Sequence, residues 1–135
     1  VRVMAAPLIP GLNDQELEKL LAAAADAGAT GADYTLLRLP HEVATLFRDW
    51  LDWQAPEKAA RIMAILYDLR GGQANDARFG SRMTGLGHFA DLIRQRFELA
   101  CRRLGLNRPW SALDCRQFTA PAPPAPAPDR QLALF

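Results

Sequence analysis

The sequence contains only two cysteines, Cys101 and Cys115, and no apolar run long enough to cross a membrane. Two cysteines are too few for a disulfide scaffold, and their spacing fits no metal site. A reducing, cytoplasmic setting is therefore expected. The sequence also lacks a signal peptide, an internal repeat and a glycine-rich phosphate loop. These absences argue against secreted disulfide scaffolds, membrane proteins and P-loop enzymes.

The composition is that of one globular domain with a real core. Half of the 135 residues are apolar and 23% are charged, a balance that excludes neither catalysis nor binding. The chain begins at Val1 and not at Met, so we expect an N-terminal part to precede it.

Positive charge is concentrated in the second half of the chain. Residues 1–77 carry 7 basic and 11 acidic side chains, whereas residues 78–116 carry 8 basic and 3 acidic ones. Such asymmetry indicates a nucleic-acid surface on the basic side, with arginines contacting phosphates and an aromatic ring stacking on a base. The alternative is an ordinary solvated helix face. The candidate nucleic-acid residues are Arg78, Phe79, Arg82, Arg94, Arg102 and Arg103.

The first fourteen residues, VRVMAAPLIPGLND, predict a strand, a rigid loop and the start of a helix. The apolar start favours a strand, and Pro7 and Pro10 hold an extended exit. Gly11 allows a tight turn, and Asn13 and Asp14 are good N-caps. In α/β folds, ligands bind at the carboxyl ends of strands. The loop is therefore either a ligand-binding loop or a structural turn.

Apolar periodicity predicts four helices and a second strand. The helices span residues 14–27, 40–55, 56–70 and 88–104, and the strand spans residues 32–39. Gly28 and Gly105 are expected to end the first and last of these helices, and Pro56 to begin the third. Pro40 is expected at the first position of its helix. Strand, helix and strand so close together predict a parallel βαβ unit. The predicted inward residues are Leu17, Leu20, Leu21, Ala24 and Ala25; Val43, Leu46, Phe47, Trp50 and Leu51; Ala59, Ile62, Met63, Leu66 and Leu69; and Phe89, Leu92, Ile93, Phe97, Ala100, Cys101 and Leu104.

The remaining segments are irregular. Residues 73–87 form a long polar loop, and loops of this length are often functional. Residues 110–118 are expected to pack back on the core through Trp110, Leu113 and Phe118.

Several single residues have two readings. Arg38 ends the second predicted strand and points toward the same edge as the first loop, where it meets either a phosphate or cofactor carboxylate, or an ordinary ion-pair partner. Tyr34 is predicted to be a core residue. His41 and His88 are isolated from other metal ligands, which favours capping or surface roles over metal binding. Cys101 lies on an apolar stripe and is predicted to be a buried thiol.

The segment VRVMAAPLIPGLNDQELEKLLAAAADAGA resembles the late strand and following helix of radical S-adenosylmethionine enzymes, which often carry a PxIPGxND-type sequence there. LLRLP, FRDWL, RGGQANDARFGSRMTGLG and the terminal LF resemble one bacterial branch related to spore photoproduct lyase. The resemblance extends over essentially the whole chain. It implies a partial (β/α) barrel, a [4Fe–4S] cluster and S-adenosylmethionine. By this resemblance the backbone of Pro7, Leu8, Ile9, Pro10 and Gly11 lines the cofactor pocket, and Arg38 lies near it.

The chain departs from this family in one respect. The CxxxCxxC motif that holds the cluster is absent, so the cluster ligands are expected upstream.

The predicted fold class is α/β. Residues 1–40 form the last βαβ part of the barrel, residues 41–118 an α-helical extension, and residues 119–135 a disordered tether and peptide. The predicted function is the C-terminal part of a lyase-like or repair-like enzyme acting on DNA, in which reductive cofactor cleavage generates a radical. The fragment alone is expected to be inactive.

The terminal pentapeptide QLALF matches the QLxLF pattern by which bacterial DNA polymerases and repair proteins resemble one another in docking on the sliding clamp. The preceding APAPPAPAP is an extended tether that presents it. Leu132, Leu134 and Phe135 suit an apolar groove, and Gln131 suits a hydrogen bond. Local packing of the tail on its own domain is the alternative. A non-catalytic module that docks on the clamp is accordingly the alternative function for the chain.

Overall fold

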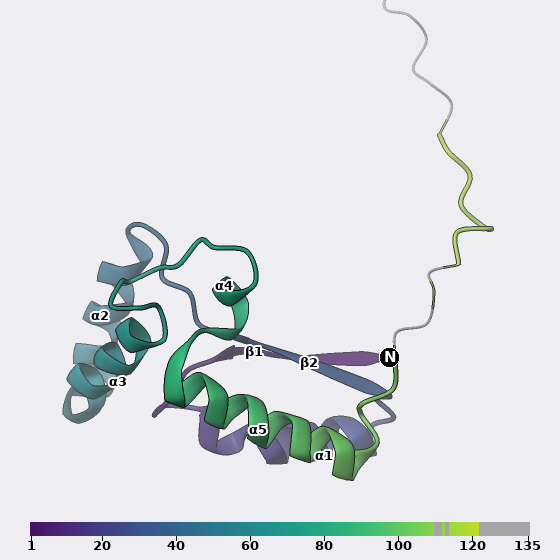
Figure 1. The fold of residues 1–135 in the computed structure, drawn as a ribbon, viewed down its shortest axis with the longest axis horizontal. Coiled ribbons are helices and arrows are strands. Elements are labelled where there is room, and N and C mark those ends of the chain that lie inside the picture. Colours follow the sequence, from purple (N-terminus) through teal and green to yellow (C-terminus); the bar gives the residue numbers. More distant parts are fainter. Residues whose placement is uncertain (110–111, 113, 122–135) are drawn as a thin grey trace, which may run out of the picture.

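The strand, helix and strand predicted at the start of the chain form a parallel βαβ unit within a mixed α/β fold (Figure 1). The computed structural model describes residues 1–109, 112 and 114–121. Its elements in chain order are β1 (Arg2–Leu8), the 3₁₀ helix η1 (Asp14–Glu16), α1 (Leu17–Asp26), β2 (Gly31–Leu36), α2 (Val43–Gln54), α3 (Pro56–Asp68), α4 (Ser81–Thr84) and α5 (Gly87–Leu104).

The helix between the two strands ends as its sequence predicts. Gly28 has a φ of 91°, and its N–H donates to Ala25 O at 2.9 Å. The N–H of Ala29 donates to Ala24 O at 2.9 Å, which completes a Schellman motif. The chain reverses at this point, so β2 returns parallel to β1, with Val3 paired to Ala32 and Met4 to Asp33.

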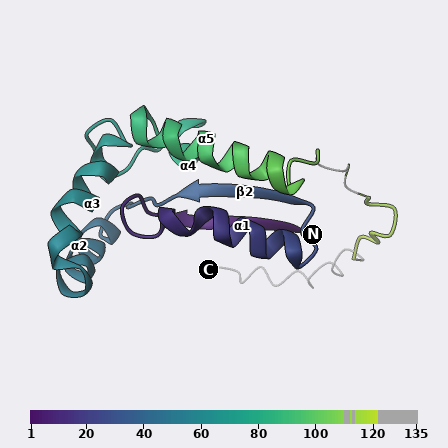
Figure 2. The same cartoon turned by 90° about the horizontal axis from the view of Figure 1, so that it is seen from below.

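Helices α1 and α5 lie side by side and cover one face of the sheet, and within the described residues no helix covers the opposite face along its length (Figures 1 and 2). Ala5 and Leu36 are buried on this face. The ring centroid of Tyr34 lies 4.7 Å from that of Phe97 on α5, so Tyr34, predicted to be a core residue, is half-buried and packs against the core. Alternation along the strands then places Met4 on the opposite, uncovered face.

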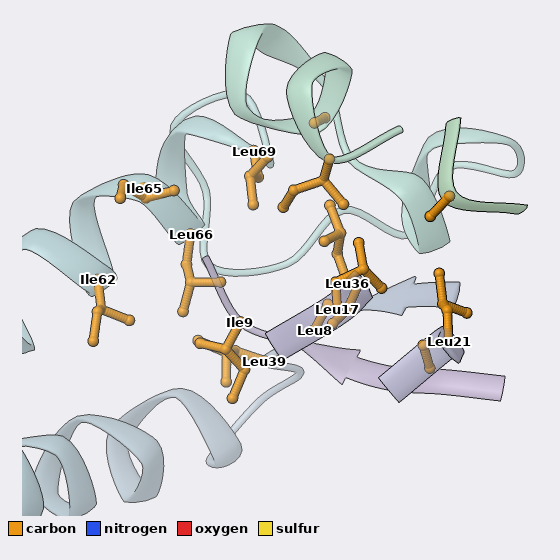
Figure 3. Packing of buried hydrophobic residues seen from close by; sticks show 14 of the residues in the cluster. Leu8, Ile9, Leu17, Leu21, Leu36, Leu39, Ile62, Ile65, Leu66 and Leu69 are labelled. Atoms are coloured by element: carbon orange, nitrogen blue, oxygen red, sulfur yellow. The ribbon is translucent and has the colours of Figure 1, made fainter. Parts of the chain in front are cut away.

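The antiparallel pair of α2 and α3 packs at the carboxyl end of the sheet (Figure 1). Pro56 occupies the first turn of α3, as predicted, and the whole predicted stripe of this helix is buried. Figure 3 shows Ile9, Leu39 and Leu66 pointing toward one another where the loops after both strands meet α3. A fully buried leucine contributes about 2 kcal/mol, so this contact fixes the loops on the helix pair.

Several apolar residues predicted to point inward are exposed. They are Leu20 on α1, Val43, Leu46 and Trp50 on α2, and Leu92 on α5. The physical reason is that, among the described residues, these helices pack against their neighbours through other faces, which leaves these positions in solvent. On α2, for example, Leu51 is fully buried, whereas the outer Leu46 is 64% exposed. Ala90 on α5, which the predicted stripe omitted, is buried.

Three local predictions also need correction. Pro40 does not begin α2; Pro40 O accepts the N–H of Val43, and the helix starts there after a turn in which His41 has a φ of 48°. The long loop contains the short helix α4. Phe118 is 74% exposed and does not pack on the core, while Trp110 and Leu113 lie outside the described residues. None of the helices in the described ranges combines the length and apolar composition needed to cross a membrane.

Candidate functional site

The loop after β1 is closed by two side chains at its end. Asn13 Oδ1 accepts the N–H of Ile9 at 2.7 Å, and Asn13 Nδ2 donates to Pro7 O at 3.0 Å. Asp14 Oδ1 accepts the N–H of Gly11 at 2.7 Å. Asn13 and Asp14 were predicted as helix N-caps. Their side chains instead form hydrogen bonds within the loop, and no side-chain capping bond to η1 is formed. The result is a rigid turn at the carboxyl end of the sheet.

The five residues expected to line a cofactor pocket are divided between core and surface. Leu8, Ile9 and Pro10 are buried, whereas Pro7 and Gly11 are exposed. The N–H groups of Ile9 and Gly11 are already bonded within the loop. A ligand at this loop would therefore meet the exposed ring of Pro7 and the Cα of Gly11, with few free backbone donors.

The cysteines do not fit an iron–sulfur cluster. Cys101 is buried on α5, as predicted, and its burial raises the pKa of the thiol. Cys115 is exposed. Within the described ranges no group of three or more His, Cys, Asp or Glu side chains is arranged to hold a metal ion. Two thiols cannot supply the three or four ligands that a cluster needs.

The uncovered face of the sheet carries polar and flexible side chains. Arg2 and Asp33 form an ion pair across the two strands at 3.0 Å. The Thr35 hydroxyl donates to Met4 Sδ at 3.9 Å, and Met4 is 58% exposed. This face is therefore open, mixed in polarity and adjacent to the exposed side of the loop after β1.

Arg70 is a central residue at this end of the fold that the sequence pattern did not single out. It follows α3 and is only 2% exposed. Its guanidinium donates to the carbonyls of Ser81 and Arg82 at 3.2 and 2.8 Å, and to those of Leu36 and Leu37 at 3.3 and 2.9 Å. Arg70 thus ties the exit of β2 to α4. The sequence feature that could have indicated this role of Arg70 is its position directly between an apolar helix and two glycines.

Arg38, the candidate anion-binding residue, is half-buried just beyond the end of β2. Burial lowers the pKa of Arg70, and the charge of Arg38 lowers it further. The Nε atoms of both arginines are buried and have no hydrogen-bond partner among the described residues. An ordinary ion pair, which was the alternative role for Arg38, is not formed within the described part of the chain.

Asp76 organises the long loop next to Arg70. It accepts from Nε and Nη2 of Arg78 at 3.0 and 3.2 Å, from the Arg78 backbone N–H at 3.0 Å, and from the Ser81 hydroxyl at 2.7 Å. The guanidinium of Arg78 is the largest cause that holds the pKa of Asp76 far below its usual range, followed by the backbone and hydroxyl donors. A cavity of about 530 Å³ adjoins this loop.

The candidate nucleic-acid residues do not form one cluster. Phe79 is 91% exposed beside α4, with the Arg82 guanidinium 5.0 Å from its ring centroid. Arg94 is paired with Asp91 at 2.8 Å midway along α5. Arg102 and Arg103 are exposed at the far end of that helix, about 22 Å along its axis from the start near α4 (Figure 1). Only Phe79 and Arg82, with Arg78 beside them, make a compact group.

The other singled-out residues are placed as follows. His41 and His88 are both exposed, which agrees with the predicted surface roles. Arg96, one of the helix arginines, is bound to Asp14 and Glu18 and therefore joins α5 to the start of α1. Gln131, Leu132, Leu134 and Phe135 lie outside the described residues.

Comparisons of the chain with protein-family models, with curated proteins and with solved structures found no match.

Proposed function

We propose that this chain is the C-terminal part of a radical S-adenosylmethionine enzyme that acts on DNA, and that its βαβ unit completes a partial barrel. The observation that carries the proposal is the half-covered parallel sheet. Helices α1 and α5 cover one face, while the face with Met4 and the Arg2–Asp33 pair is open in the part of the chain that the structure describes. The proposed reaction class comes from the resemblance of the loop after β1 to radical S-adenosylmethionine enzymes.

A parallel sheet with an open face is an incomplete unit. Parallel sheets normally occur with both faces covered, and two strands alone are marginally stable. Further parallel strands from the same polypeptide would extend the sheet and curve it around the open face, which would then line the barrel interior. Hydrogen exchange tests this step: backbone amides of β1 are expected to exchange more slowly in the intact parent polypeptide than in this chain. Equal exchange of β1 in both would contradict sheet completion.

In the proposed enzyme the loop after β1 forms one side of the cofactor site. The bonds from Asn13 and Asp14 hold the loop after β1 so that Pro7 and Gly11 face outward at the carboxyl end of the sheet. The cluster must be held by cysteines elsewhere in the parent polypeptide, because the described residues do not fit it. Cluster and S-adenosylmethionine together would supply one-electron cleavage chemistry.

Anaerobic reconstitution tests the assignment to this enzyme class. The intact parent polypeptide, treated with iron and sulfide, is expected to gain the broad visible absorbance of an iron–sulfur cluster. The present chain under the same treatment is the matched control, and is expected to gain none because it has too few cysteines. A parent polypeptide that binds no iron would contradict the proposal.

DNA contact is proposed at the group formed by Arg78, Phe79 and Arg82. An exposed aromatic ring beside an arginine suits a base stacked on the ring with its phosphate near the guanidinium. Phe79→Ala and Arg82→Ala are each expected to weaken binding of a single-stranded oligonucleotide about tenfold at low salt. Arg116→Ala removes an exposed arginine elsewhere and is the control. If all three variants lose the same affinity for the oligonucleotide, binding does not depend on this group of residues, and the proposed DNA-contact surface is wrong.

A second function is proposed for the terminal QLALF peptide, carried by its match to the clamp-docking pattern. The chain would then deliver its parent enzyme, or itself alone, to the DNA sliding clamp. Binding to purified clamp is measured for the full chain and for a chain lacking residues 131–135. Loss of binding on deletion is expected, with Gln131→Ala weakening it and Asp129→Ala as the neighbouring control. Equal binding after deletion would remove this function.

A further inference from the structure

The loop formed by residues 76–82 is anchored to the fold at two points. At its start, Asp76 is only 6% exposed and accepts a hydrogen bond from the Ser81 hydroxyl at 2.7 Å. At its end, the buried guanidinium of Arg70 donates to the carbonyls of Ser81 and Arg82 at 3.2 and 2.8 Å. The same guanidinium bonds the backbone at the end of β2. The loop is therefore attached to the carboxyl end of the sheet.

Between these anchors the loop presents an aromatic ring to solvent. Phe79 is 91% exposed, and the Arg82 guanidinium lies over its ring, 5.0 Å from the centroid. The ring as a whole is almost fully exposed, so the face opposite Arg82 is open to a stacking partner. Nucleobases are such partners, because every base has a π-face that stacks on an aromatic side chain.

Asp76 also fixes the side chain of Arg78. Its Oδ1 accepts the Nε–H and the backbone N–H of Arg78, both at 3.0 Å, and its Oδ2 accepts an Nη2–H at 3.2 Å. These bonds occupy the Nε edge of the guanidinium. The edge formed by the two Nη atoms remains for a second anion, and 69% of the Arg78 side chain is exposed. Phosphate oxygens bind such an edge through two parallel hydrogen bonds.

An unpaired nucleotide fits this arrangement better than a continuous duplex. In a duplex each base is stacked between its neighbours, so neither of its faces is accessible to a protein ring. An unpaired base can lie on an exposed ring. Arg78 directly precedes Phe79 in the chain, so neighbouring residues offer one contact for the base and one for its phosphate.

We propose that residues 76–82 bind an unpaired nucleotide of DNA, with Phe79 on the base and Arg78 on the phosphate, and that Asp76 is the positioning residue of this site. This role rests on the DNA contact proposed above and adds to it the form of the DNA and the function of a carboxylate. Asp76 holds Arg78 in place before the ligand arrives, so less side-chain freedom is lost on binding.

Asp76→Asn separates positioning from net charge. Removing a negative charge beside a phosphate contact should strengthen binding if charge alone matters. Asparagine retains a side-chain oxygen for the Ser81 hydroxyl but loses the ion pair with Arg78. Positioning therefore predicts the opposite sign: Asp76→Asn weakens binding of a labelled single-stranded oligothymidylate to the full 135-residue chain about fivefold. Fluorescence anisotropy at low salt measures the affinity.

The chain contains a matched control for this variant. Asp114 accepts the same three bonds from Arg116, through its backbone N–H, Nε and Nη2, at an exposed position with no hydroxyl partner in the described structure. Asp114→Asn is expected to leave the affinity unchanged or slightly higher. Arg78→Lys is a second probe that leaves Asp76 intact. It keeps the positive charge but loses the planar fork, so it is also expected to weaken binding about fivefold.

Double variants show whether Asp76 acts through Arg78. Arg78→Ala is expected to weaken binding about tenfold in the wild type but only about twofold when Asp76→Asn is present. Phe79→Ala is expected to weaken single-strand binding by the same factor in both backgrounds, because the anchor at Arg70 still holds the loop. It is expected to leave the affinity for a blunt-ended duplex of the same length unchanged. Circular dichroism verifies that each variant folds.

The outcomes distinguish this role from the DNA contact itself. If Phe79→Ala leaves single-strand binding unchanged, the DNA contact is wrong and the role of Asp76 falls with it. If Phe79→Ala weakens binding while Asp76→Asn or Arg78→Lys binds as tightly as the wild type, the contact stands and positioning is overturned. Positioning is also overturned if Asp76→Asn reduces the effects of Phe79→Ala and Arg78→Ala equally, since Asp76 then only maintains the loop. Equal losses on single strand and duplex reject the unpaired nucleotide.

Discussion

Replacing Asn13 with alanine is expected to destabilise the fold by about 2 kcal/mol. The side chain accepts the partly buried N–H of Ile9 at 2.7 Å and donates to Pro7 O at 3.0 Å. Leaving the Ile9 N–H without an acceptor costs about 1–1.5 kcal/mol, and loss of the exposed bond to Pro7 costs about 0.5 kcal/mol. With a slope of about 2 kcal/mol per molar urea, the unfolding midpoint falls by about 1 M.

Two further variants make this prediction specific to the loop. Asn13→Asp retains the acceptor for Ile9 but loses the donor to Pro7, so its midpoint is expected to lie between those of wild type and Asn13→Ala. Gln15→Ala alters an exposed neighbouring amide and is expected to stay within about 0.5 kcal/mol of wild type. If Asn13→Ala unfolds at the same urea concentration as Gln15→Ala, the amide does not hold the loop and the reasoning is refuted.

Two other stability predictions follow from close contacts. Gly85→Ala is expected to cost about 2 kcal/mol, because φ is +74° and the new Cβ would lie 3.0 Å from Leu36 Cδ1. Gly71→Ala, at φ +64° in open space, should cost only about 1 kcal/mol, and equal midpoints for the two variants would contradict the contact. Arg96→Gln is expected to cost about 1 kcal/mol at neutral pH, after allowing for solvent screening. Hydrogen bonding from Arg96 lowers the pKa of Glu18, so this contribution is complete above the ordinary Glu pKa of about 4.3 and is lost as the pH falls through the lower folded value. The difference in urea midpoint between wild type and Arg96→Gln should therefore shrink in acid, although the bond from Arg96 to the Asp14 carbonyl persists, and a constant difference would exclude this linkage.

Sequence patterns predicted the elements where local chemistry decides them. Pro56 at the start of α3, Gly28 after α1 and Gly105 after α5 each act at one backbone position, and all three end or begin a helix as expected. The buried stripe of α3 was also predicted correctly, because this helix packs between α2 and the loops after both strands.

Predictions failed where the number of neighbours decides the outcome. An apolar stripe shows which face of a helix prefers burial, but not whether anything covers it. Leu46 and Trp50 on α2 remain exposed for this reason. The roles of Asn13 and Arg70 depend on which carbonyls and amides the folded chain brings within reach, and spacing along the sequence does not contain that information.

The assignment to radical S-adenosylmethionine chemistry is tested most directly by cofactor cleavage. The intact parent polypeptide, reconstituted anaerobically and supplied with a reductant, is incubated with S-adenosylmethionine, and methionine release is followed by chromatography. Release that requires both the cluster and the reductant is the predicted result, with a lower rate for Asn13→Ala at equal cluster content. A polypeptide that carries a cluster and leaves S-adenosylmethionine intact would contradict the proposed function.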